Sequence, residues 1–141
     1  MKEFIALFIW VLTMLAGNAD AQTYKVIVNN ANETESVSKK ELSMVFLKKK
    51  KQWDNGVAIT PVEHPVRAEL RASFSKDVFN KSVDAMRSYW QRAIFSGLAT
   101  APVEKPTDRE IVEFVKNNEG AIGYVSTATS TVGVKTLVIK E

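Results

Sequence analysis

The residues best suited to chemistry lie between positions 63 and 71. His64 is the only histidine of the chain and precedes a proline, and Arg67 and Arg71 are spaced one helical turn apart. Guanidinium groups hold carboxylates and phosphates through paired N–H donors, so this stretch predicts an anion-binding site at the start of a helix. A lone histidine before a proline is more often a surface or capping residue than a ligand, and both interpretations stay open.

No catalytic group of side chains accompanies these residues. Glu63 and Glu69 are the nearest carboxylates, and nothing in the pattern pairs them. The chain has one histidine and no cysteine, so the common His/Cys zinc sites are not available. The nucleophile elbow of serine hydrolases, the phosphate-binding P-loop and the zinc-protease helix are also missing. The sequence therefore predicts a protein that is not an enzyme and that needs no metal or cofactor.

Four consecutive lysines, Lys48, Lys49, Lys50 and Lys51, form the second candidate site. They follow a predicted helix, where cations complement the negative end of the helix dipole. One interpretation is a solvated turn matched to that dipole. The other is an interaction patch for an anionic partner, such as a periplasmic or membrane protein.

The N-terminus has the pattern of a secretory signal. Lys2 and Glu3 precede an apolar run to Leu15, and Ala19-Asp20-Ala21 is an A-x-A cleavage site. We expect residues 1–21 to be removed and residues 22–141 to form one domain. The competing interpretation, a membrane anchor, needs a run of about 20 apolar residues, and this run is shorter. An exported chain without cysteine fits the periplasm of a Gram-negative bacterium, with no membrane span after cleavage.

The charge of the chain argues against a nucleic-acid partner. The net charge of the chain is +3. The predicted signal carries Lys2, Glu3 and Asp20, a net −1, so cleavage raises the net charge of the remaining chain to +4. A balance this small favours an anionic partner only through weak long-range attraction. A small anion is therefore a possible ligand, and nucleic acid is not expected.

The remaining pattern predicts an α/β domain organised around residues 119–125. That stretch is nearly uncharged and contains Gly120 and Gly123, which predicts a central strand that another backbone, or a ligand, approaches closely. Capping-box residues predict helices over 38–47 and from 107 to 117. We also expect helices from His64 onward and over 82–95, a left-handed cap at Gly97, and strands over 24–29, 57–62 and 134–140. One core should unite Val26, Phe46, Trp53, Phe74, Trp90, Phe114 and Ile122.

Several of these stretches, in the same order, resemble one known family. Residues 38–47 followed by Trp53 and Gly56 resemble an L-S-x-x-x-L-x-x-I-F stretch of the periplasmic phosphate-binding proteins of ABC transporters. Residues 119–125, Glu-Gly-Ala-Ile-Gly-Tyr-Val, are similar to their P-G-A-I-G-Y-V. Trp90, Phe95-Ser96-Gly97 and Pro102 are similar to a short, exported, single-domain branch of that family.

The resemblance implies a type 2 periplasmic-binding-protein-like fold, a mixed sheet flanked by helices, reduced here to a single lobe. It also implies a solute-binding protein of the phosphate transport type. The family's phosphate loop is not preserved, because its arginine falls on Glu63 and its Ser-Gly-Thr on residues 68–70. Two functions follow: a small solute-binding-like protein that uses His64, Arg67 and Arg71, or an interaction module that kept the fold and lost the ligand.

Overall fold

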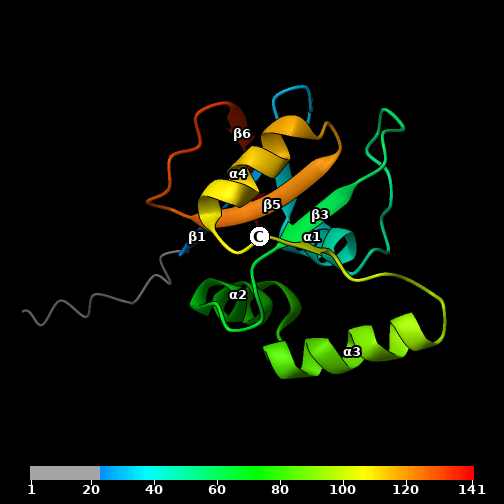
Figure 1. The fold of residues 1–141 in the computed structure, drawn as a ribbon. Helices are drawn as coiled ribbons and strands as arrows, with labels where there is room; N and C mark the ends of the chain where they lie inside the picture. Colours follow the sequence, from blue (N-terminus) through cyan, green and yellow to red (C-terminus); the bar gives the residue numbers. More distant parts are fainter. Residues whose placement is uncertain (1–22) are drawn as a thin grey trace, which may run out of the picture.

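A five-stranded mixed sheet forms the centre of the protein, and helices lie on both of its faces (Figure 1). The computed structural model describes residues 23–141, so the predicted signal, residues 1–21, lies outside the described part. The strand order is β4-β3-β5-β1-β6, and β2 and β7 form a separate parallel pair. The α/β class with a mixed sheet flanked by helices is confirmed. The elements are β1 Tyr24–Asn29, β2 Ser36–Ser38, α1 Lys39–Phe46, β3 Thr60–Glu63, α2 Glu69–Phe74, the π-helical η1 Ser75–Phe79, α3 Val83–Phe95, β4 Val103–Glu104, α4 Asp108–Asn117, β5 Ala121–Ser126, β6 Val134–Thr136 and β7 Val138–Lys140.

The glycine-containing strand β5 is central, as predicted. It is parallel to β3 and antiparallel to β1, and its first five residues are buried. A Cβ atom added to Gly120 would lie 1.9 Å from the carbonyl oxygen of Ala58. The predicted close approach of another backbone is therefore confirmed at Gly120, whose carbonyl also accepts a hydrogen bond from the Trp53 indole at 3.1 Å.

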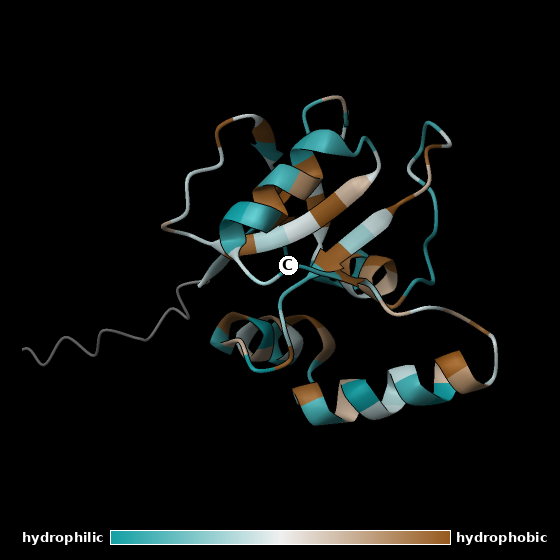
Figure 2. Cartoon of the chain, viewed as in Figure 1, coloured by the Kyte–Doolittle hydropathy of each residue, from teal (hydrophilic) through white to brown (hydrophobic). Residues whose placement is uncertain are grey.

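The sheet separates two apolar clusters, because side chains alternate between its faces along each strand. Val26 and Ile122 face the cluster beneath α1 and α2, whereas Ile27 and Val125 face the cluster beneath α4. On the first face the Tyr124 ring stacks on Phe74 at a centroid distance of 3.8 Å. Figure 2 shows α4 with its hydrophilic side outward and the apolar residues of the strands lying between the helices.

The expectation of one core is wrong, since the sheet backbone divides it. Val26, Phe46, Trp53, Phe74 and Ile122 share the first cluster. Phe114 is half-buried on the opposite face, where the Lys105 ammonium lies 5.4 Å from its ring centroid. Trp90 is buried within α3 and belongs to neither cluster. Helix α3 lies apart from the sheet in Figure 1, packed near η1.

Helix ends with capping residues lie where the sequence placed them. The Ser38 hydroxyl accepts a hydrogen bond from the backbone N–H of Glu41 at 3.0 Å, and Thr107 accepts one from Glu110 at 3.2 Å. Gly97 follows α3 with φ +73°, the left-handed conformation that glycine adopts without strain. Capping hydrogen bonds depend on a few adjacent residues, so they can be predicted from the sequence.

Three element boundaries differ from the prediction. The strand expected over 57–62 begins only at Thr60. The helix expected from His64 begins only at Glu69, because residues 65–68 form a turn closed by the N–H of Ala68 and the carbonyl of Pro65 at 3.0 Å. The strand expected over 134–140 is divided between two sheets. The N–H of Leu137 donates to Val26 and that of Val138 donates to Glu35, so the chain changes partner between β6 and β7.

Candidate functional site

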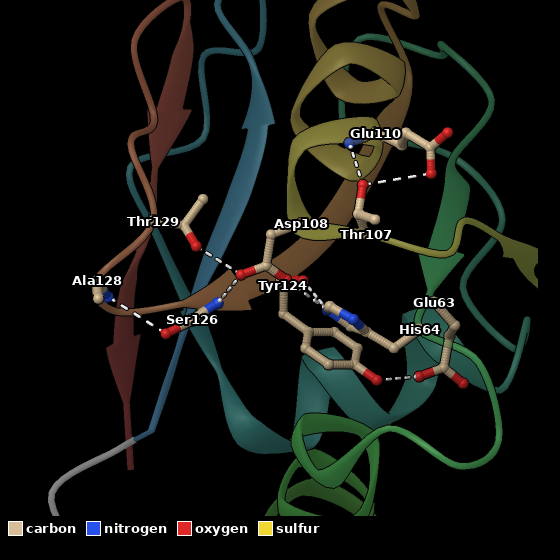
Figure 3. A network of polar contacts seen from close by, with 9 residues as sticks. All are labelled: Glu63, His64, Thr107, Asp108, Glu110, Tyr124, Ser126, Ala128 and Thr129. Atoms are coloured by element: carbon tan, nitrogen blue, oxygen red, sulfur yellow. Dashed lines mark hydrogen bonds and ion pairs between the residues drawn. The ribbon is translucent and has the colours of Figure 1, made fainter.

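A polar cluster with a buried centre lies where β3 and β5 end (Figure 3). Because these strands are parallel, their carboxyl ends meet at one edge of the sheet, the edge at which α/β folds commonly bind ligands. The first residue of α4 and the middle of α2 bring further charged side chains to that edge. We call this group the strand-end cluster; it comprises Glu63, His64, Arg71, Glu104, Asp108 and Tyr124.

Glu63 is the most deeply placed acid of the strand-end cluster. Its residue is 4% exposed, and one carboxylate oxygen accepts the Tyr124 hydroxyl at 2.6 Å. Burial raises the pKa of the Glu63 carboxyl above its ordinary value, although the Arg71 cation and the Tyr124 hydrogen bond favour its charged form. Burial and the adjacent Glu63 carboxylate also raise the pKa of the Tyr124 phenol, so Tyr124 acts as a neutral donor.

Arg71 joins the acids of the cluster. Its guanidinium donates to Glu104 at 2.7 Å and to the backbone carbonyl of His64 at 2.9 Å. A second guanidinium nitrogen lies 3.5 Å from Glu63. The side chain is buried, and its donors already face two carboxylates and a carbonyl. An external anion would have to displace these acceptors, which a buried cation gives up only at high cost.

His64 contradicts the interpretation of a surface or capping residue. It is buried, and its Nε2 atom lies 2.8 Å from the carbonyl oxygen of Tyr124. A carbonyl only accepts, so Nε2 carries the proton. The same nitrogen is 3.5 Å from Asp108, which accepts the backbone N–H of Ser126 at 3.0 Å and the Thr129 hydroxyl. These contacts link the start of α4, the end of β5 and the segment that follows it.

The structure brings together two of the three predicted ligand residues. His64 and Arg71 lie in the strand-end cluster, whereas Arg67 is exposed in the turn before α2 and forms no hydrogen bond or ion pair with the described residues. Helix α2 has only six residues, and its N-cap residue, Ala68, supplies no side-chain hydrogen bond. A ligand role for His64, Arg67 and Arg71 stays a prediction, and Arg71 would need to leave its acids to fulfil it.

Three members of the cluster were missed by sequence reasoning. Glu104 is 33 positions from Arg71, and Tyr124 is 61 positions from Glu63. Asp108 was recognised only as part of a helix start. Pairings over such separations leave no local pattern in a single sequence. The position of Glu63 directly after the apolar Val62 was the only indication of a buried acid.

A basic surface lies elsewhere, between the end of α1, the second half of α3 and the segment that follows it. A groove of about 420 Å³ is lined there by Lys48, Lys49, Lys51 and Arg92 together with apolar residues such as Leu98. Two neighbouring hollows involve Lys50 and Phe95. We define the basic surface as Lys48, Lys49, Lys50, Lys51, Arg92, Phe95 and Leu98.

The lysine run ends α1, and its role as an interaction patch stays a prediction. The backbone N–H groups of Lys48 and Lys49 donate to carbonyls of the last turn of α1, which agrees with the helix-ending role. Lys48 has φ +57°, which turns the chain away from the helix axis. Burial lowers the pKa of the Lys48 ammonium, which also donates to the Thr100 hydroxyl at 3.2 Å. Lys49 and Lys51 are exposed and form no ion pair with any described residue.

Two further features are absent from residues 23–141. No group of three or more His, Cys, Asp or Glu side chains in that range is arranged to hold a metal ion. No helix in the same range is both long enough and apolar enough to span a bilayer.

Comparison with known proteins identifies the fold. No family model and no curated protein match the sequence. Among solved structures, an ABC-type phosphate transport receptor from Vibrio cholerae matches 83% of this chain with a TM-score of 0.68 and 16% identity. A putative phosphate ABC transporter substrate-binding protein from Clostridium perfringens, solved with bound phosphate, matches 83% with a TM-score of 0.67 and 17% identity. A possible phosphate-binding protein from Planctomyces limnophilus gives 0.63 over 84%, also at 17% identity.

The chain spans less than half of the length of these structures. The matches cover 46%, 44% and 42% of the three solved chains. The resemblance predicted from the sequence is therefore confirmed at the level of the fold, over less than half of each solved chain. At this identity and coverage, the likeness shows the fold and does not show the function.

Proposed function

We propose that this chain is an exported, non-enzymatic protein that uses the solute-binding-protein fold as an interaction module and does not carry phosphate. The observation that supports this most directly is that the donors of Arg71 already have acceptors within the protein. Arg71 is the buried cation at the ligand edge of the sheet, and its donors face Glu63, Glu104 and the His64 carbonyl. A high-affinity anion site needs buried donors without buried acceptors beside them.

The resemblance of the sequence to the phosphate-binding family supports the same proposal. The family's clamp arginine falls on Glu63, an acid whose charge would repel phosphate. Its Ser-Gly-Thr falls on residues 68–70, where Ala68 supplies no side-chain hydroxyl or amide to the start of α2. The chain also spans less than half of each matched structure, so the likeness to these structures does not by itself assign their ligand to this chain.

A second candidate is a solute-binding-like lobe that binds a small anion. The likeness to a structure with bound phosphate favours it, and so does the exposed, unpaired Arg67 in the described chain. In this candidate Arg67 would hold the anion at the surface. His64 and Arg71 would stabilise the strand ends next to it through the contacts of the strand-end cluster.

Calorimetry with inorganic phosphate at low salt separates the two candidates. The proposed function predicts no binding tighter than about 0.1 mM, or roughly −5.5 kcal/mol. A micromolar constant that is lost in Arg67→Ala would overturn it in favour of the second candidate. Arg67→Ala is the informative variant, because it leaves the contacts of the buried Arg71 intact. Arg109→Ala, which removes the same charge from an exposed position of α4 on the other face of the sheet, is the matched control.

Export and periplasmic location belong to the same proposal and rest on residues 1–21. N-terminal sequencing of the protein recovered from the periplasm of an expressing bacterium should begin at Gln22-Thr23-Tyr24. Met1 retained on membrane-bound protein would show instead that the apolar run is an anchor.

A further inference from the structure

The basic surface combines cations and apolar side chains without acids. Five of its members, Lys48–Lys51 and Arg92, are positively charged, and they line three neighbouring hollows. None of the described residues that line these hollows is Asp or Glu. Most surfaces intersperse the two signs of charge, so this one presents a positive field that the described part of the chain leaves unbalanced.

Two apolar side chains project from the same surface. Phe95, the last residue of α3, is 93% exposed, and Leu98 is 76% exposed. Phe95 shares a hollow with Arg92, and Leu98 shares the groove with Lys48 and Lys51. Figure 2 shows this end of α3 as apolar, projecting beyond the layers around the sheet. Large apolar groups left in water beside cations mark an interaction surface.

We propose that the basic surface docks this protein on an anionic lipid surface, with Phe95 and Leu98 entering the interfacial region and the lysines above them contacting headgroup phosphates. This inference rests on the proposed function, because it names the partner of the interaction module. Exposed Phe and Leu beside Lys and Arg are the composition by which proteins lie on anionic membranes. Lysine suits this role, since its long stem lets the ammonium reach headgroups while the backbone stays above them.

Charge complementarity and shape favour lipid over the other occupants. A second copy of the chain would bring two sets of cations together, which opposes self-association through this face. An acidic protein would balance the charge, but it would have to match a side chain that stands almost entirely clear of its neighbours, at 93% exposure. A lipid interface accepts such a projecting ring without shape complementarity.

Co-sedimentation with vesicles tests the inference on the exported protein with its N-terminus determined. We expect binding to vesicles of phosphatidylglycerol and phosphatidylcholine, no binding to phosphatidylcholine alone, and release at high salt because the attraction is screened. Lys49→Glu with Lys51→Glu should weaken partitioning by more than about 25-fold, since each cation near an anionic surface contributes about fivefold. Phe95→Ser should weaken it about tenfold through lost apolar burial.

Matched controls separate this surface from general charge and hydrophobicity. Arg109→Glu with Lys116→Glu makes the same charge change on α4, at the opposite face of the sheet, and should leave partitioning within about threefold through long-range field alone. Val132→Ser removes another apolar side chain, which is 85% exposed, and should have no effect. Inorganic phosphate should compete no better than chloride of equal ionic strength, because the site requires the lipid interface.

Three results would overturn the inference. They are a protein that stays in the supernatant with anionic vesicles at low salt, equal binding to phosphatidylcholine, and equal losses in the α4 control. Binding to an acidic protein in the absence of vesicle binding would assign the surface to a protein partner. The outcome is separable from the proposed function, because phosphate binding in calorimetry would overturn that function whatever the vesicles show.

Discussion

The strand-end cluster and the basic surface contain similar side chains in opposite environments. In the cluster, Arg71 is buried against Glu63 and Glu104 at 3.5 and 2.7 Å. On the basic surface, Lys49 and Lys51 are exposed and unpaired among the described residues. The contacts of the cluster join α2, β3, β4 and β5. Lys49 and Lys51 join no elements through ion pairs with the described residues. A charge with internal partners therefore stabilises the fold, whereas a charge without them is available to an external ligand.

The largest expected effect comes from breaking the cluster. Arg71→Met removes the cation and leaves Glu63 buried without its partner, so the free energy of unfolding should fall by about 3–5 kcal/mol. Urea unfolding monitored by circular dichroism measures it. Adding Glu63→Gln should recover more than half of the loss, because the amide oxygen still accepts the Tyr124 hydroxyl.

Arg67→Ala is the control for this comparison, since Arg67 is exposed and outside the cluster. Its effect should stay within about 0.5 kcal/mol, as for most surface changes. Equal losses in Arg67→Ala and Arg71→Met would mean that the two arginines act together and that the cluster is not a closed unit.

The contrast between the two regions also explains what the sequence could predict. The starts of α1 and α4 were predicted because Ser38 with Glu41, and Thr107 with Glu110, satisfy free N–H groups within four residues. The central position of β5 was predicted from Gly120, whose missing side chain makes room for the backbone of Ala58. The Lys48–Lys51 patch was visible because consecutive charges need no fold to be recognised.

The strand-end cluster could not be predicted in the same way. Its pairs join residues 33 and 61 positions apart, and only the parallel pairing of β3 with β5 brings them together. The start of α2 was misplaced because Pro65 resembles a helix-starting proline, whereas residues 65–68 form a turn. Trp90 was correctly expected to be buried and wrongly assigned to the core, since an apolar helix face does not say which surface covers it.

A second prediction concerns the attachment of α3, which carries Phe95 of the basic surface. Trp90 is 5% exposed although it lies outside both apolar clusters. Trp90→Ala should lower the free energy of unfolding by about 3 kcal/mol, the lower end for a buried large aromatic, because the site lies near the edge of the structure. Tyr89→Ala, at the neighbouring half-buried position, is the control and should cost less. A loss below about 1 kcal/mol would place the Trp90 ring at the surface and extend the basic surface along α3.

A third prediction uses the pH dependence of the cluster. The pKa of Glu63 is raised by burial above its ordinary value of 4.5. A group with a raised folded-state pKa contributes stability below its unfolded pKa and loses it as pH rises through the folded pKa. Chemical unfolding from pH 4 upward should therefore show a declining contribution that Glu63→Gln abolishes. A Glu63→Gln profile with the same slope as the parent would mean that Arg71 keeps the carboxylate charged throughout.

A fourth prediction concerns the stability of the basic surface, where we expect the smallest change in the free energy of unfolding. Lys49→Glu with Lys51→Glu makes a larger charge change on the basic surface than Arg71→Met makes in the cluster, yet its two side chains have no described partner to lose. Placing acids after the end of α1 opposes the helix dipole, which costs a few tenths of a kcal/mol. Relief of repulsion within the four-lysine run offsets this by a similar amount. The net change in unfolding free energy should stay within about 0.5 kcal/mol, measured by urea unfolding at low and at high salt. A loss of 2 kcal/mol or more would show that the lysines stabilise the fold, and the basic surface would then no longer differ in kind from the strand-end cluster.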